Sequence, residues 1–174
     1  AVRALGREGL SVAVGESTRL ATAAFSRYCR RIVVYPSPLT EPERFIDALE
    51  SELSRHPCRM ILPMEDETTG LLSQHRPHLS KYACIPVVSP EKYRLANRKD
   101  AVLKIAREIG IPVPRTWFVD DPSRIDHIKD SLPYPVVIKP RIGSGAVGIV
   151  YASNADELTA GYSNICRRFP NPLI

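Results

Sequence analysis

A lysine followed closely by a glycine-rich loop is the feature of this sequence best suited to chemistry. Residues 134–148 read Tyr-Pro-Val-Val-Ile-Lys-Pro-Arg-Ile-Gly-Ser-Gly-Ala-Val-Gly, so Lys139 ends an apolar segment and the loop begins at Gly143. Since glycine has no Cβ, the amides of such a loop can approach phosphate oxygens, whose charge the lysine ammonium would neutralise. Two alternative interpretations remain: Lys139 is an ordinary surface lysine, and the glycines simply form a tight hairpin turn. Three glycines within six positions exceed what a two-residue hairpin turn requires.

The same loop fits the pattern G-x-G-x-x-G, which is also typical of dinucleotide-binding proteins. In those proteins a helix follows the loop directly, and the N-terminus of that helix holds the pyrophosphate. Here residues 148–151 read Gly-Ile-Val-Tyr, which predicts a strand, and the next helix begins at Ser153 and Asn154. The sequence therefore predicts a flap between two strands. A nicotinamide-dependent oxidoreductase stays an alternative, because a parallel sheet is also predicted.

A second lysine, Lys99, precedes a predicted helix over residues 101–110. Apolar side chains recur in this segment at helical spacing, and its final glycine is typical of a helix end. Pro112 and Pro114 then favour extended backbone that leads into a predicted strand over residues 116–119. An ordinary surface lysine is the alternative interpretation of Lys99.

In this order, the two segments resemble the ATP-grasp superfamily, in which a lysine or arginine opens a helix, "GIPVP" follows, and a second lysine precedes a glycine flap. The resemblance is in particular to the N-terminal part of a carbamoyl-phosphate synthase large subunit. It implies that both lysines contact ATP phosphates and that the loop closes over them. The ATP-binding residues that it implies are Lys99, Lys139, Gly143, Ser144, Gly145 and Gly148.

The resemblance also implies a reaction, in which Mg²⁺-ATP phosphorylates a carboxylate-type substrate and an amine or other nucleophile attacks the acyl phosphate. No catalytic side chain is identified, since this chemistry depends on aligning the phosphate and neutralising its charge. In this superfamily the Mg²⁺ ligands come after the flap subdomain, so we expect them beyond Ile174 and expect residues 1–174 alone to be inactive. Asp156 and Glu157 fit the start of a helix better than a metal site. A non-catalytic nucleotide-binding or regulatory domain is the alternative function.

The first half of the chain alternates predicted strands and helices, which is typical of a parallel sheet covered on both faces. Strands are predicted over residues 11–15, 31–35, 59–63 and 85–88, and helices over residues 20–28, 41–55 and 66–76, the last ended by Pro77. Residues 2–8 are interpreted as the tail of a helix whose preceding strand is missing. The predicted fold class is α/β. Residues 1–89 resemble the Rossmann-like domain that precedes the ATP-grasp module, and residues 90–174 resemble a partial α+β ATP-grasp subdomain.

Acidic residues follow two of the predicted strands of the first domain. Glu65, Asp66 and Glu67 stand between a strand and a helix, and Glu16 follows the first strand. Ligands of parallel sheets bind at the carboxyl ends of the strands, so these acids are candidate substrate contacts. Helix capping by Glu65 or Asp66 is the alternative interpretation.

The composition is that of an ordinary globular protein, with 174 residues, 44% of them hydrophobic and 25% charged, and a net charge of +5. The basic residues are scattered, so no nucleic-acid partner is predicted. No apolar run is long enough for a membrane, and no signal peptide is visible. The four histidines and four cysteines lack metal-ligand spacing, and the cysteines are interpreted as free thiols in the cytoplasm. The expected partners are small-molecule carboxylate and nucleophile substrates, and a homo-oligomer is compatible with the sequence.

Overall fold

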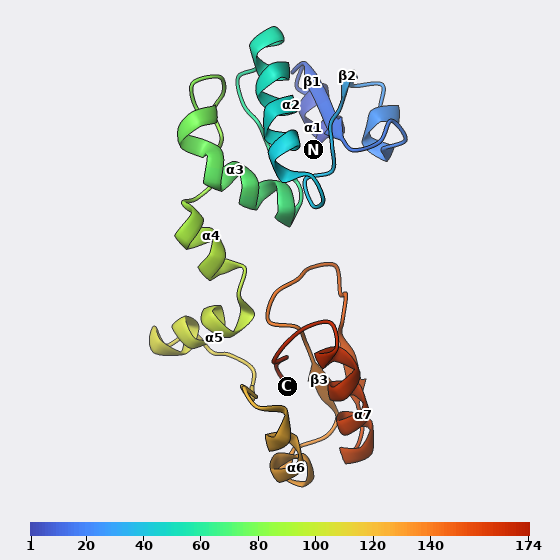
Figure 1. The fold of residues 1–174 in the computed structure, drawn as a ribbon, viewed down its shortest axis with the longest axis vertical. Coiled ribbons are helices and arrows are strands. Elements are labelled where there is room, and N and C mark those ends of the chain that lie inside the picture. The colour runs from blue at the N-terminus through green and yellow to red at the C-terminus, as the bar shows by residue number, and fades with distance from the viewer. The chain divides into compact units, whose positions relative to one another are not determined.

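The computed structural model describes residues 1–174 as two compact units, Ala1–Pro90 and Glu91–Ile174, each with a hydrophobic core of its own. Figure 1 labels the helices and strands in chain order. A small parallel sheet with helices comes first and an α+β region follows, which confirms the predicted α/β class. None of the helices is both long enough and apolar enough to span a bilayer.

Two parallel strands form the sheet of the first unit. β1 (Val12–Glu16) pairs with β2 (Cys29–Val34) along the length of both strands. Helix α1 (Val2–Arg7) precedes β1, and the longer helices α2 (Pro42–Arg55) and α3 (Asp66–Leu79) follow β2. The strands predicted near residues 11–15 and 31–35 and the helices predicted over residues 41–55 and 66–76 are therefore present, whereas the full alternation of strands and helices is not.

The core of the first unit is built mainly from α2, α3 and the segment after α3. Its buried side chains are Phe45, Ile46, Leu53, Leu72, Leu79, Ala83 and Ile85. A polar cluster reinforces the same junction, because Glu50 on α2 accepts hydrogen bonds from His78 Nε2 at 2.9 Å and from the Tyr82 hydroxyl at 2.7 Å. Lys81 Nζ lies 3.3 Å from the same carboxylate. Glu50 thus ties α2 to the end of α3 and the loop behind it.

The helix predicted over residues 20–28 is wrong. The structure has only a single 3₁₀ turn there, η1 (Thr22–Phe25). Leu20 and Phe25 are 78% and 74% exposed, so the segment packs no apolar face on a core. Without such packing a short helix is not stable, because nucleation costs more than a few hydrogen bonds return.

The regular strands predicted over residues 59–63 and 85–88 are also wrong. These segments are joined by one isolated parallel bridge, between Met60 and Cys84. Each segment contains a proline, and proline has no N–H to donate to a ladder. The parallel sheet is therefore smaller than the sequence pattern suggests.

Helix α3 does not end at Pro77, as predicted, but continues to Leu79. Proline in the last turn costs the helix one hydrogen bond, whereas a proline in mid-helix would disturb a longer ladder. Leu79 is fully buried, and this burial favours the extra turn.

The second unit combines a β-hairpin with helices and short helical turns. Helix α4 (Pro90–Ala96) begins at the division between the units, and α5 (Lys99–Glu108) follows it. The short turns are η2 (Pro122–Arg124), α6 (Ile125–Ile128) and η3 (Lys129–Ser131). Then come the hairpin strands β3 (Val136–Ile138) and β4 (Val150–Ala152), which pair antiparallel, and helix α7 (Ala155–Cys166). The predicted order of strand, glycine loop, strand and separate helix is confirmed.

The residues after α7 extend this sheet by backbone pairing. Leu173 exchanges two hydrogen bonds with Lys139, each 2.8 Å long. Ile174 exchanges two with Trp117, of 2.8 and 3.2 Å. The segment before Ile174 thus lies between the end of β3 and the chain that follows α5.

The strand predicted over residues 116–119 is reduced to one antiparallel bridge, between Phe118 and Leu173. Pro114 precedes this segment and Pro122 follows it, so only a short stretch has donors available for pairing. The prediction of a regular strand is therefore wrong, although the segment is extended and paired.

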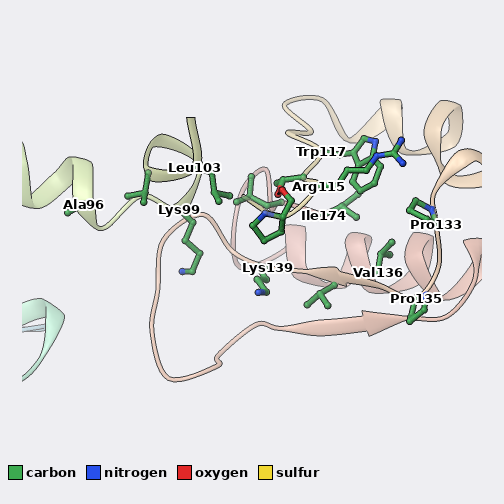
Figure 2. A pocket seen from close by; sticks show the side chains of 15 residues that line it. Ala96, Lys99, Leu103, Arg115, Trp117, Pro133, Pro135, Val136, Lys139 and Ile174 are labelled. Atoms are coloured by element: carbon green, nitrogen blue, oxygen red, sulfur yellow. The ribbon is translucent and has the colours of Figure 1, made fainter. Parts of the chain in front are cut away.

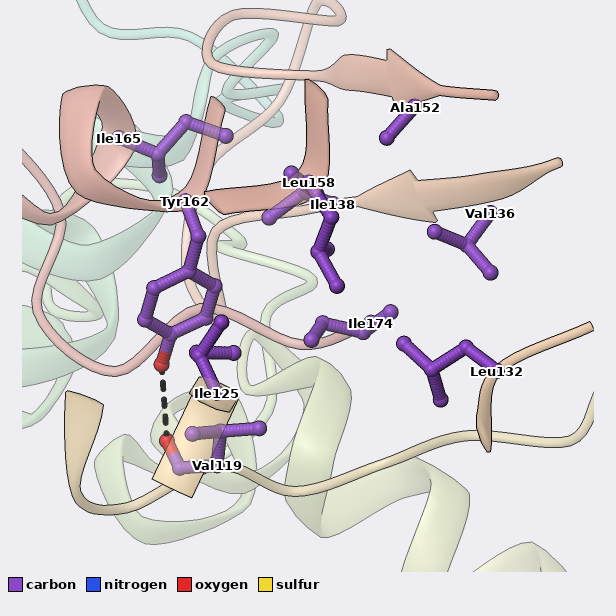
Figure 3. Packing of buried hydrophobic residues seen from close by; sticks show 10 residues of the cluster. All are labelled: Val119, Ile125, Leu132, Val136, Ile138, Ala152, Leu158, Tyr162, Ile165 and Ile174. Atoms are coloured by element: carbon purple, nitrogen blue, oxygen red, sulfur yellow. Dashed lines mark hydrogen bonds between the residues drawn. The ribbon is translucent and has the colours of Figure 1, made fainter. Parts of the chain in front are cut away.

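The core of the second unit lies between α7, the hairpin and the chain after α5 (Figure 3). Its buried residues are Val119, Ile125, Leu132, Val136, Ile138, Ala152, Leu158, Tyr162, Ile165 and Ile174. The Tyr162 hydroxyl donates a hydrogen bond of 3.3 Å to the Val119 carbonyl, which satisfies the one polar group of this cluster. Gly161 allows α7 to approach the hairpin, because a Cβ there would lie 2.9 Å from Val150 Cγ1.

Candidate functional site

Lys139 lies directly after β3, where the strand leads into the glycine-rich loop. Val136 and Ile138 are buried on the core side of the strand. Side chains alternate along a strand, so Val137 and Lys139 lie on the opposite side. The Lys139 backbone is held by Leu173, while its side chain is exposed. The strand therefore fixes the backbone from which the Lys139 side chain extends, and it leaves the ammonium group exposed.

Lys99 is the first residue of α5. Its backbone N–H donates a hydrogen bond of 2.8 Å to the Arg141 carbonyl, and its Nζ donates one of 2.6 Å to the Gly143 carbonyl. The lysine that opens the helix therefore touches the loop that follows the other lysine. The two predicted phosphate contacts, distant in sequence, are brought together at one place in the second unit.

A pocket of about 540 Å³ is lined by both lysines (Figure 2). Small-molecule sites typically measure about 300–1,000 Å³. Figure 2 shows both lysine side chains extending in the same direction, into the space that the glycine loop borders. The apolar part of the lining consists of Ala96, Val102, Leu103, Pro114, Trp117, Pro133, Pro135, Val136, Val137, Leu173 and Ile174.

The charges of this pocket are all positive. Arg115 is the remaining charged residue of the lining, and its guanidinium carbon lies 4.7 Å from the centre of the Trp117 ring. This distance is typical of a cation–π contact. A pocket with an apolar wall and ammonium groups at one side can bind a ligand that has a flat apolar part and an anionic part.

The glycine loop between β3 and β4 requires backbone conformations that favour glycine. Gly143, Gly145 and Gly148 have φ angles of +127°, +63° and +74°, and Ala146 shares this region with a φ of +62°. An added Cβ at Gly143 or Gly145 would meet nothing within 4 Å, so these positions border open space. Ser144 between them is exposed. The first half of the loop is therefore open to solvent, while the Val147 amide donates to the Ser144 carbonyl within the loop.

Arg141 and Asp100 form a polar centre beneath this site, and sequence reasoning did not identify either as functional. Arg141 Nη1 donates to Asp100 Oδ2 at 3.2 Å, and the Asp100 side chain is only 4% exposed. Arg98 also binds both carboxylate oxygens of Asp100, and this hydrogen bonding lowers the pKa of Asp100. The position of Arg141 two residues after Lys139 was the only sequence signal. Its acceptors lie on other segments, which no local pattern reveals.

The candidate substrate acids lie in the first unit. Burial raises the pKa of Tyr35 to about 12, with further contributions from the negative charges of Glu16 and Glu65. The negative charges of these two acids, at the ends of different segments, thus act on the same hydroxyl group. Glu65 stands at the N-cap position of α3, but its side chain makes no capping hydrogen bond. Asp66 and Glu67 occupy the first turn of that helix, where carboxylates favour the helix dipole.

Carboxylates that could hold a metal ion are not grouped in residues 1–174. No three His, Cys, Asp or Glu side chains are placed to share an ion. Glu157 instead accepts hydrogen bonds from Ser153 N at 2.8 Å and Asn154 Nδ2 at 3.1 Å, while Asn154 Oδ1 accepts one from Glu157 N at 2.9 Å. This reciprocal arrangement caps α7. Glu157 therefore has a structural role at the start of α7, where Asp156 also lies in the first turn.

Comparison with known proteins gives one similar sequence and several similar structures. No protein-family model matches the sequence. D-aspartate ligase of Enterococcus faecium (strain Aus0004) is 26% identical over 84 residues, which are 47% of this chain and 20% of that protein.

Among solved structures, an L-amino acid ligase from Bacillus licheniformis has a TM-score of 0.70 at 16% identity, covering 99% of this chain and 39% of its own. An ADP complex of N5-carboxyaminoimidazole ribonucleotide synthetase has a TM-score of 0.71 at 15% identity, covering 99% of this chain and 42% of its own. The fold of this chain is therefore that of the N-terminal part of these two proteins. The likeness includes both units, and the chain spans about two fifths of the length of these structures.

Proposed function

We propose that this chain is the nucleotide-binding N-terminal part of an ATP-dependent ligase that activates a carboxylate substrate as an acyl phosphate. The observation that carries the proposal is one pocket lined by both Lys99 and Lys139, with the Lys99 ammonium also hydrogen-bonded to Gly143 of the glycine loop. The pocket has an apolar wall for a base and cations for phosphates. The first unit is proposed to be the domain that precedes the ATP-grasp module, and the second its first subdomain.

In this proposal the two lysines act by neutralising phosphate charge. Lys139 is positioned by the end of β3, and Lys99 by the start of α5. Ammonium groups and backbone amides that are already in place stabilise the charge that develops during phosphoryl transfer without having to reorganise. Lys99 Nζ, which contacts the Gly143 carbonyl, would exchange this contact for a phosphate oxygen when nucleotide binds. Mg²⁺ is the proposed partner of ATP in this transfer, and the place of its ligands stays a prediction.

The substrate class is proposed from the relatives and from the acids of the first unit. The D-aspartate ligase and the L-amino acid ligase favour an amino acid as one substrate. Glu16 and Glu65, whose charges both raise the pKa of Tyr35, are the acids proposed to contact its amino group. A reaction like that of carbamoyl-phosphate synthase stays a prediction.

The test is substrate-dependent release of ADP by the complete native protein, in a screen of amino acids in pairs and of bicarbonate with an amine donor. Lys139→Ala should lower the turnover about 100-fold, because one preorganised charge is removed from the transferring phosphate. Lys92→Ala is the matched control, since Lys92 is exposed on α4 and outside the pocket. Equal turnover of both variants would contradict the assignment of Lys139.

A nucleotide-binding domain without catalysis is the second candidate function. ADP binding without ADP release under any substrate combination would support it. A nicotinamide-dependent oxidoreductase is disfavoured, because β4 and not a helix follows the glycine loop.

A further inference from the structure

Arg141 is held by four acceptors on three other segments of the second unit. Its Nη1 donates to Asp100 at the start of α5, and its Nη2 donates to the Val119 carbonyl at 3.2 Å and to Asp120 Oδ1 at 2.6 Å. Its Nε donates to the Asn171 carbonyl. The side chain is only 14% exposed. A guanidinium has five N–H donors in a planar fork, so these contacts engage most of its capacity.

The backbone of Arg141 is tied to the same centre. Its carbonyl accepts the hydrogen bond from the Lys99 amide at 2.8 Å, while its side chain binds the carboxylate of Asp100, the next residue. The first turn of α5 is therefore attached to Arg141 at two adjacent positions. In the chain, Arg141 also stands two residues after Lys139 and two before Gly143.

The position of Arg141 connects it to both lysines, but it does not line the pocket. Its donors point at protein acceptors, so it is not available as a third phosphate contact. Lysine could not replace it, because a single ammonium lacks the rigid fork that reaches acceptors on several segments.

We propose that Arg141 is a positioning residue, which sets the Lys99 ammonium relative to Lys139 and the glycine loop by clamping Asp100. This inference rests on the proposed nucleotide site and adds a residue to it. When the clamp is lost, the first turn of α5 shifts, and Lys99 no longer meets the phosphate that Lys139 binds. Lys139 keeps its own pairing with Leu173.

A double-mutant cycle on the protein tests this role. The readout is the affinity for ADP, followed by the fluorescence of Trp117, which lines the pocket and is the single tryptophan of the 174 residues. Arg141→Lys should weaken ADP binding about tenfold, as expected for coupled neighbours. In a Lys99→Ala background the same change should have an effect of about twofold or less, because the residue through which Arg141 acts is already absent.

An equal loss in both backgrounds would overturn the proposal, since Arg141 would then act independently of Lys99. Arg167→Lys is the matched control, because Arg167 is exposed at the end of α7, and it should leave ADP affinity unchanged. If Arg141→Lys does not fold, as judged by thermal unfolding, Asp100→Asn replaces it in the same cycle. This change keeps the shape of the side chain and removes the charge that Arg141 binds.

The lysine variants separate this proposal from the proposed function. If Lys139→Ala weakens ADP binding and Arg141→Lys does not, the nucleotide site stands and the positioning role is wrong. If neither Lys99→Ala nor Lys139→Ala changes ADP affinity, the proposed nucleotide site itself is wrong, and the positioning role is rejected with it.

Discussion

Single side chains in this protein connect segments that the sequence separates widely. Glu50 joins α2 to His78, Lys81 and Tyr82, and Arg141 joins α5 to the chain around Val119 and Asn171. In both cases one ionised group is satisfied by several partners. For Glu50 these partners lower the pKa of the carboxyl group, so its contribution to stability depends on pH.

Glu50 gives a prediction about acid unfolding. Hydrogen bonds from His78, then from Tyr82, lower its pKa from 4.5 to about 2 in the folded protein. A carboxylate with a depressed folded pKa stabilises the fold above its unfolded pKa and loses this contribution as pH falls. We expect Glu50→Gln to be less stable than the wild type at pH 7, and the difference to shrink between pH 4.5 and about 2.

Urea unfolding of the first unit at a series of pH values measures this effect. Glu43→Gln is a suitable control, because Glu43 is exposed in the first turn of the same helix. A Glu50→Gln deficit that is the same at pH 7 and pH 3 would show that the depressed pKa is not the cause.

At the scale of elements, the close approach of α7 to the hairpin depends on Gly161. A larger side chain there would collide with Val150 and Ile138. We predict that Gly161→Leu destabilises the second unit by about 1–3 kcal/mol through overpacking. Ala160→Leu, one position along the same helix but exposed, should change stability by less than about 0.5 kcal/mol. Thermal unfolding of both variants provides the comparison, and equal losses would argue against a tight contact at Gly161.

Two glycines of the loop, Gly145 and Gly148, should respond differently to an added methyl group. Gly145→Ala places a Cβ in open space, so it costs only the positive φ, about 1–2 kcal/mol. Gly148→Ala carries the same cost, and its Cβ would also lie 2.8 Å from side-chain atoms of both Phe169 and Pro140. We therefore expect Gly148→Ala to be clearly the less stable variant in thermal unfolding. The reverse order would mean that the loop adopts another conformation.

Local patterns predicted the elements around the pocket well, because each is encoded by neighbouring residues. Three of these features can be read directly from the sequence: the apolar alternation at Val136 and Ile138, the glycines of the loop, and the start of a helix near Lys99. The strands predicted over residues 59–63 and 116–119 are each reduced to one bridge, because prolines in or beside them leave few N–H donors for pairing. The role of Arg141 was missed because Asp100, Val119 and Asn171 become its neighbours only in the folded unit.

For the whole molecule, the two units have separate cores, and all of the lining residues of the pocket belong to the second. We predict that Leu72→Ala, in the first core, destabilises its unit by about 2–5 kcal/mol and leaves ADP affinity unchanged. Leu158→Ala, in the second core, should cost a similar amount and also weaken ADP binding. Hydrogen exchange resolved by unit, together with Trp117 fluorescence, measures both effects.

Loss of ADP binding in both variants would indicate that the units unfold as one cooperative system.

The pairing of residues 171–174 also fixes the order of events on the ribosome. Lys139 finds its backbone partner in Leu173, Trp117 finds its own in Ile174, and Arg141 needs the Asn171 carbonyl. None of these partners exists while the hairpin and α7 are being synthesised. Until residue 174 has emerged from the ribosome, the backbone groups of Lys139 and Trp117 that pair with residues 173 and 174 form an unpaired strand edge. During that interval the pocket cannot form, and the exposed edge is open to chaperones or to pairing with another chain.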